Sequence, residues 1–168
     1  MNTIQGDLID LASAGRFDVI VHGNNCHCNM DEGIAARIKS AFPEAFWADQ
    51  STGKGNRTKL GDYSHAEIER QGDLPSLVVV NAYTQYDYKG KTRLVDYEAL
   101  RSCFRRIKQD FSGKSLGYSR IGAGMAKGDW GVIASIINEE LQGENHTCVV
   151  LVPVAAQAAG GASRRKRR

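Results

Sequence analysis

Apolar residues in this chain fall into short continuous runs and into runs with helical spacing. Continuous β-branched runs are typical of strands buried on both faces, and apolar stripes every three to four residues indicate amphipathic helices. The two kinds of run follow one another as far as residue 152. Strands are predicted at 2–5, 17–22, 63–69, 77–82, 115–119 and 147–152, and helices at 8–13, 32–42, 43–49, 95–111 and 130–141.

This alternation predicts the α/β class, with a central sheet that is largely parallel or mixed. Residues 63–69 alternate only weakly and predict an edge strand. At 168 residues the chain is long enough for one domain with its own core, which we assign to residues 1–154. Residues 155–163 are rich in Ala and Gly and precede a basic cluster, so a disordered tail is predicted over 155–168.

The composition, 42% hydrophobic and 24% charged, is that of an ordinary soluble globular protein. No apolar run approaches the roughly 20 residues that a membrane-spanning helix needs, and the N-terminus lacks a signal-peptide pattern. The 4 cysteines are too sparse for a disulfide scaffold. These features predict a cytoplasmic protein without a membrane partner.

The net charge of +3 is concentrated at the C-terminus. Five basic residues lie in 164–168, and without them 17 basic residues face 19 acidic ones, a net charge of −2. Basic surface is a sign of nucleic-acid binding. The overall charge therefore favours a nucleic-acid partner only for the tail.

Two glycine-bearing loops, at 22–35 and 121–130, each follow a strand-like run and lead into a helix-like run. Glycine lets backbone N–H groups approach a ligand closely, and a helix N-terminus adds partial positive charge. Two such loops are suited to hold a diphosphate from both sides. The sequence therefore predicts a nucleotide pocket.

The order of short motifs resembles the macrodomain family over residues 1–154. Gly6-Asp7-Leu8 follows the first strand, an Asn-containing loop follows the next, Gly33-Ile34-Ala35 opens a helix, and Ile121-Gly122-Ala123-Gly124 precedes a later helix. Within the family, residues 22–35 look most like the branch of ADP-ribose 1″-phosphate phosphatases. The resemblance implies a three-layer α/β/α sandwich, an ADP-ribose cleft at the C-terminal ends of central strands, and no cofactor.

The resemblance also implies which residues contact ADP-ribose. Asp7 would accept a hydrogen bond from the adenine amino group, Asn25 would face the distal ribose, and His27 would be a second polar contact. The structural alternatives are that Asp7 caps the following helix, that Asn25 forms a turn, and that the glycines only make tight turns. The remaining implied ligand residues are Leu8, Gly33, Ile34, Ala35, Gly122, Ala123, Gly124, Met125 and Ala126.

His22 and Asp129 are the candidate catalytic residues. His22 matches a histidine of the phosphatase branch, and a histidine near pH 7 can act as nucleophile or general acid/base toward a phosphate monoester. Asp129 would orient the histidine or carry a proton. The alternatives are a core histidine bonded to the backbone and an N-cap for the helix that starts at Trp130.

The chain departs from the family pattern in two ways. Many macrodomains have glycines where this chain has Asp31, a candidate helix cap, and Glu32. These carboxylates would repel an anion unless they point away, or would act as acid/base groups near the distal ribose. In the branch that removes ADP-ribose from protein carboxylates with a Lys–Asp pair, the Asp falls on Ala126 here, which argues against that mechanism.

Two further motifs carry weaker signals. Cys26-His27-Cys28 has no second ligand pair downstream, so no metal site is predicted. Three tyrosines, at 83, 86 and 88, are followed by three cations, at 89, 91 and 93, which indicates a solvated loop beside the cleft or a contact with substrate or nucleic acid.

The leading functional hypothesis is hydrolysis of ADP-ribose 1″-phosphate to ADP-ribose and phosphate. One alternative is a non-catalytic module that binds ADP-ribose or a derivative. Another is a hydrolase that removes ADP-ribose from a protein or nucleic acid.

Overall fold

The structure, a computed structural model, describes residues 1–151, which form the predicted α/β fold. Within these residues six strands make one sheet with the order β1-β6-β5-β2-β4-β3. All pairs are parallel except β3 with β4, which is antiparallel at the predicted edge. In chain order the elements are β1 (Asn2–Gln5), α1 (Leu8–Ser13), β2 (Val19–Asn25), α2 (Gly33–Ala41), α3 (Pro43–Gln50), η1 (Arg57–Lys59), β3 (Tyr63–Ile68), β4 (Leu77–Gln85), α4 (Tyr97–Asp110), β5 (Leu116–Tyr118), α5 (Trp130–Glu140) and β6 (His146–Val150).

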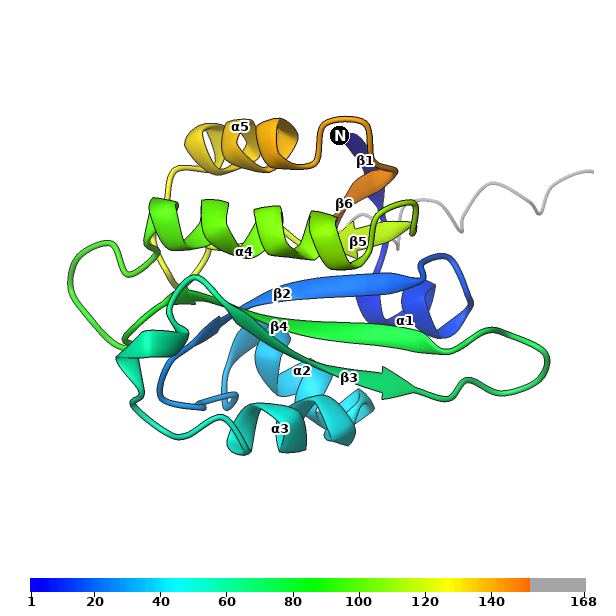
Figure 1. Cartoon of the computed structure of the whole chain (residues 1–168), viewed down its shortest axis with the longest axis horizontal. Helices are drawn as coiled ribbons and strands as arrows, with labels where there is room; N and C mark the ends of the chain where they lie inside the picture. The colour runs from blue at the N-terminus through cyan, green and yellow to red at the C-terminus, as the bar shows by residue number, and fades with distance from the viewer. Residues whose placement is uncertain (152–168) are drawn as a thin grey trace, which may run out of the picture.

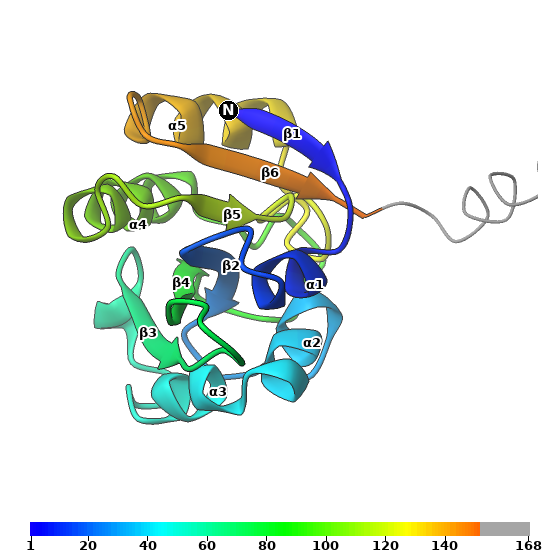
Figure 2. The same cartoon turned by 90° about the vertical axis from the view of Figure 1, so that its right-hand side faces the viewer.

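Helices cover both faces of the sheet, which gives the three layers that the resemblance implied (Figure 1). α4 and α5 lie on one face, and α1, α2 and α3 lie on the other (Figure 2). One apolar cluster packs α4 and α5 onto the sheet around Phe104, and a second packs the other helices around Ile38. Consecutive residues of β2 alternate between them, with Ile20 in the second cluster and Val21 in the first.

β2 and β4 continue beyond their apolar runs, to Asn25 and Gln85. Their pairing register shifts between Asn24 and Asn25, which pair with Tyr83 and Gln85, so Thr84 is the extra residue of a β-bulge. The strand ends are polar and carry no apolar signal, which is why the sequence pattern stops short of them. Pairing with the neighbouring strand extends both elements to the edge of the sheet.

α2 begins without the predicted cap. Glu32 occupies the N-cap position, and its side chain makes no capping hydrogen bond. Asp31 instead accepts hydrogen bonds from Asn29 Nδ2 at 2.8 Å and from Lys39 Nζ at 3.0 Å. The prediction of Asp31 as the cap is therefore wrong, because a nearby ammonium and amide take its oxygens.

None of the helices in residues 1–151 is both long and apolar enough to cross a membrane. The tail predicted at 155–168 lies outside the described residues, and its disorder stays a prediction. The same holds for the domain boundary at residue 154.

Asp18 links the segments that precede β2 and β5. Its Oδ2 accepts hydrogen bonds from Ser115 N and Ser115 Oγ, both at 2.8 Å. The Asp18 N–H also donates to Ser115 Oγ at 3.0 Å. The hydrogen bond from the Ser115 backbone is the main cause that holds the pKa of Asp18 below its usual value of 3.8.

We expect Asp18→Asn to lower the free energy of unfolding at pH 7 by about 1–2 kcal/mol, because it removes a charged acceptor from these hydrogen bonds. The folded-state pKa lies below the unfolded one, so this contribution is complete above the unfolded pKa and is lost as the pH falls through the folded value. Urea denaturation of both proteins at pH 7 and pH 3 should show a smaller difference at pH 3. An equal difference at the two pH values would contradict this assignment.

Candidate functional site

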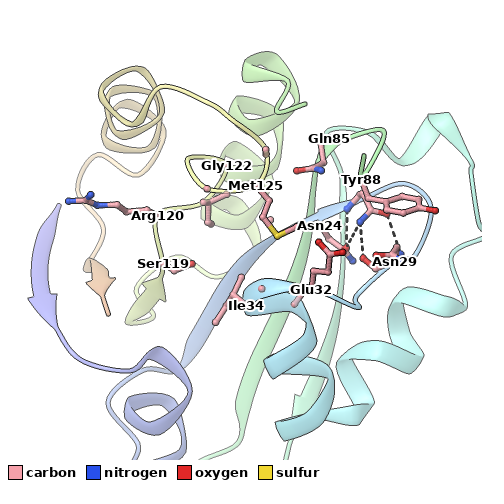
Figure 3. A pocket seen from close by; sticks show the side chains of 17 residues that line it. Asn24, Asn29, Glu32, Ile34, Gln85, Tyr88, Ser119, Arg120, Gly122 and Met125 are labelled. Atoms are coloured by element: carbon pink, nitrogen blue, oxygen red, sulfur yellow. Dashed lines mark hydrogen bonds between the residues drawn. The ribbon is translucent and has the colours of Figure 1, made fainter. Parts of the chain in front are cut away.

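A pocket of about 260 Å³ opens at the edge of the sheet where β2, β4 and β5 end (Figure 3). The start of α2 forms one wall and the loop at 121–126 forms the opposite wall. Parallel pairing brings the carboxyl ends of the three strands to this edge, where α/β folds bind ligands. The lining residues are Gly23, Asn24, Asn25, Asn29, Glu32, Gly33, Ile34, Ala35, Gln85, Tyr88, Ser119, Arg120, Ile121, Gly122, Gly124, Met125 and Ala126.

The N-terminus of α2 presents free backbone donors to the pocket. Within residues 1–151, no acceptor takes the N–H groups of Gly33, Ile34 or Ala35, whereas α1, α4 and α5 are each capped by an aspartate. Gly33 has φ of 59°, in the left-handed region that favours glycine. Unpaired N–H groups and the helix dipole make this end of α2 suited to an anion.

The glycines of the opposite wall have different roles. Gly128 N donates to Gly122 O at 2.8 Å, and a Cβ at Gly122 or Gly128 would lie 2.9 Å or 2.6 Å from a methyl group of Val95. These two glycines are therefore needed for packing. A Cβ at Gly124 would meet nothing within 4 Å, so the absence of its side chain keeps the pocket open.

Asn24, rather than Asn25, has a buried amide donor without a partner among residues 1–151. Asn25 lines the pocket, but its Oδ1 accepts from the N–H groups of His27 at 3.1 Å and Asn29 at 3.2 Å, and its Nδ2 donates to Asn29 O at 2.8 Å. The turn-forming alternative for Asn25 is thus present. Asn24 is 2% exposed, and its Nδ2 has no partner among residues 1–151.

Glu32 and Tyr88 lie at the same end of the pocket as Asn24 (Figure 3). The Glu32 side chain makes no hydrogen bond or ion pair with any described residue, and its carboxylate points toward Met125. The neighbouring carboxylate of Asp31 does not line the pocket. Only the second acidic residue of the pair is therefore placed to meet a ligand.

His22 lies in the core, not in the pocket. It is fully buried, with Nε2 2.6 Å from Asn81 Oδ1 and Nδ1 3.2 Å from Gly23 O. Burial lowers the pKa of His22 below 6.5, which disfavours its charged form. The side chain does not line the pocket, so the core alternative describes its placement, and a catalytic role for His22 stays a prediction.

Asp129 caps α5. Its Oδ1 accepts from the N–H groups of Gly131 at 2.7 Å and Val132 at 3.3 Å, and its side chain does not line the pocket. The N-cap alternative is therefore the observed role. The structure does not bring Asp129 together with His22, so a catalytic pair of these residues has no geometric basis.

Four residues that the resemblance implied as ligand contacts lie outside the pocket lining. Asp7 caps α1 and pairs with Arg37, and Leu8 is buried in the core. The His27 ring packs edge-on against Tyr86, with centroids 4.7 Å apart. The full set outside the lining is Asp7, Leu8, His27 and Ala123.

The sequence analysis did not identify several lining residues, because they lie at or just after the polar ends of strands, where the apolar pattern gives no signal. Asn24 is the last but one residue of β2, Gln85 ends β4, and Ser119 and Arg120 come directly after β5. The rule that ligands bind at the carboxyl ends of parallel strands would have found them. Arg120 lies at the end of the pocket opposite Tyr88 (Figure 3).

Cys26 and Cys28 are part of the buried side of the first glycine-bearing loop, at 22–35. Both are buried, and Lys59 Nζ donates to Cys28 Sγ at 3.0 Å and to Thr52 Oγ1 at 2.7 Å. Gln50 Nε2 also donates to Cys28 O at 2.8 Å. In residues 1–151 no group of three or more His, Cys, Asp and Glu side chains is arranged to hold a metal ion.

Similarity to known proteins agrees with this architecture. The family model of the Macro domain matches residues 21–137. An uncharacterized 17.5 kDa protein in the tk-vs intergenic region of Enterobacteria phage T4 is 34% identical over 140 residues, which are 80% of this chain and 86% of that protein.

Two solved structures share the fold. A protein of unknown function from Bacteroides thetaiotaomicron aligns with a TM-score of 0.74 at 24% identity, over 90% of this chain and 97% of that chain. Thermosipho africanus DarTG in complex with ADP-ribose aligns with a TM-score of 0.69 at 18% identity, over 92% of this chain and 42% of that chain. The fold, the strand-end pocket and the family match together show that this chain belongs to the Macro domain family.

Proposed function

We propose that this protein binds ADP-ribose in the pocket between α2 and the loop at 121–126. The observation that carries this proposal is the uncapped N-terminus of α2. It lines the pocket on the wall opposite Gly124, where no side chain fills the space. Diphosphate oxygens accept hydrogen bonds only, so they complement the N–H groups of Gly33, Ile34 and Ala35. The similar fold of DarTG, solved with ADP-ribose, supports the same ligand.

The polar groups at the two ends of the pocket indicate which way round ADP-ribose binds. A ribose has hydroxyl groups that donate and accept, and Asn24 Nδ2 and the Glu32 carboxylate supply one free donor and free acceptors. We therefore assign the distal ribose to this end. The adenosine half then lies toward Arg120, whose planar guanidinium is suited to stack on a base.

We expect Gly124→Val to weaken ADP-ribose binding by about 10-fold or more, because the new side chain fills the space between the two walls. Nothing within 4 Å opposes a Cβ there, so the melting temperature should change little. Calorimetric titration and thermal melting of the same sample measure both. Unchanged affinity in a folded variant would contradict the assigned pocket.

Glu32 gives the pocket a group for hydrolysis at the distal ribose. We propose that its carboxylate takes a proton from a water that attacks C1″. The bond from C1″ to the carried group then breaks, and the proton passes to the leaving atom. Positive charge develops on the sugar ring in such a reaction, and a nearby carboxylate stabilises it.

The same carboxylate weighs against ADP-ribose 1″-phosphate as the substrate. A terminal phosphate monoester would place further negative charge beside Glu32, and like charges repel. The phosphatase hypothesis also depended on His22 and Asp129, which do not line the pocket. We therefore favour a hydrolase that removes ADP-ribose from a macromolecule.

We expect Glu32→Gln to lower the turnover of an ADP-ribosylated substrate by about 100-fold or more, because the amide cannot accept the proton from water. Affinity for ADP-ribose should stay within about threefold, since the amide still offers an acceptor. Release of ADP-ribose from a mono-ADP-ribosylated peptide or oligonucleotide, and of phosphate from ADP-ribose 1″-phosphate, are the assays.

Asp31→Asn is the matched control, because it removes the adjacent carboxylate, which bonds Lys39 and does not line the pocket. Its turnover should equal that of the wild type. Equal losses in both variants would argue against Glu32 as the base. Wild-type protein that binds ADP-ribose but turns over none of these substrates would identify a binding module instead.

A further inference from the structure

Exposed cations gather beside the distal end of the pocket. They come from the segment around η1, from the loop between β4 and α4, and from the loop before α5. Figure 1 shows the first two segments at the same end of the molecule, where β2 and β4 end. We call this set the basic rim: Lys54, Arg57, Lys89, Lys91, Arg93 and Lys127.

None of these six cations forms an ion pair with a carboxylate of residues 1–151. Elsewhere, arginines such as Arg37, Arg101 and Arg105 do pair with acidic side chains. The loop between β4 and α4 has two carboxylates, of which Asp96 caps α4 and Asp87 lies 3.2 Å from His27 Nε2. The rim is therefore positive although residues 1–151 carry a net negative charge.

Three of the cations rest on tyrosine rings. The guanidinium carbon of Arg57 lies 3.6 Å from the Tyr86 ring centroid, and that of Arg93 lies 4.2 Å from the Tyr97 centroid. Lys89 Nζ lies 5.6 Å from the Tyr88 centroid. Such contacts hold charged groups at the surface without neutralising them, and the two guanidinium groups among them are flat.

Contacts make the rim continuous with the pocket. Tyr86 Oη donates to Gly55 O at 3.1 Å, which joins the η1 segment to the loop after β4. Lys127 Nζ donates to Gly90 O at 2.7 Å, which joins that loop to the second glycine loop. Tyr88, between these two links, is 37% exposed and also lines the pocket.

We propose that the basic rim binds a single-stranded nucleic acid, and that this strand is the macromolecule carrying the ADP-ribose group. The second part rests on the function proposed above, because it places C1″ at the Tyr88 end. Unpaired cations complement a phosphate backbone, and exposed tyrosine and guanidinium planes stack on unpaired bases. An acidic peptide would use the charges but not the stacked planes.

The test measures binding of fluorescent 12-nucleotide single-stranded DNA and RNA of one mixed sequence, and of the matching DNA duplex. The protein is the full chain in which the five basic residues at 164–168 are replaced by serine, so that the tail cations do not contribute. The rim variant carries Arg57→Gln, Lys89→Gln and Arg93→Gln. The control variant carries Arg16→Gln, Lys108→Gln and Lys114→Gln, which remove equal charge near the other end of the strands, from exposed Arg16 and Lys114 and from half-buried Lys108.

We expect the rim variant to bind the single strands at least about 10-fold more weakly, and its salt slope to fall by about 2, since each lost phosphate contact accounts for about 0.7. The control variant should stay within about threefold of its parent. The single strand that binds more tightly, DNA or RNA, is the one that the rim prefers.

Equal losses in the rim and control variants, tighter binding of the duplex, or no binding of either single strand would overturn the proposal. ADP-ribose titrated into the same samples separates the two proposals. If the rim variant keeps the parent's affinity for ADP-ribose while losing the strand, both stand. If the parent binds the strand but not ADP-ribose, the pocket assignment fails and the rim remains.

Discussion

The parallel pairing of β2 with both β4 and β5 is the constraint on which the site depends. It brings three carboxyl ends to one edge of the sheet, so loops that are far apart in the sequence must meet there. The start of α2 and the loop at 121–126 become the two walls of one pocket for this reason. The Asp18–Ser115 hydrogen bonds hold the opposite ends of β2 and β5 together.

Buried polar contacts then shape the loops that the strands bring together. Asn25 closes the turn to Asn29, and Lys59 reaches Cys28 from beneath. His22 is tied to Asn81, which donates to Ala45 O of α3 at 2.8 Å. The polar residues that the sequence suggested as ligand contacts or catalytic groups largely hold the first loop in place, because a buried amide or imidazole needs hydrogen-bond partners.

The two walls and the end of the pocket differ in charge. Free N–H groups at the start of α2 attract an anion, whereas Glu32 beside them repels one. A ligand with its negative charge in the middle and a neutral sugar at the end satisfies both groups. The basic rim adds positive charge outside the pocket, beyond Tyr88.

Sequence alone determined the type and order of the elements, because apolar periodicity and glycine chemistry are local. It therefore located both walls of the pocket and Gly124 in one of them. Only the tertiary structure decided that Asn24 is free where Asn25 is engaged, and that His22 points into the core. Those outcomes depend on strand register, a β-bulge and hydrogen-bond partners up to 59 residues away in the sequence, which no local pattern records.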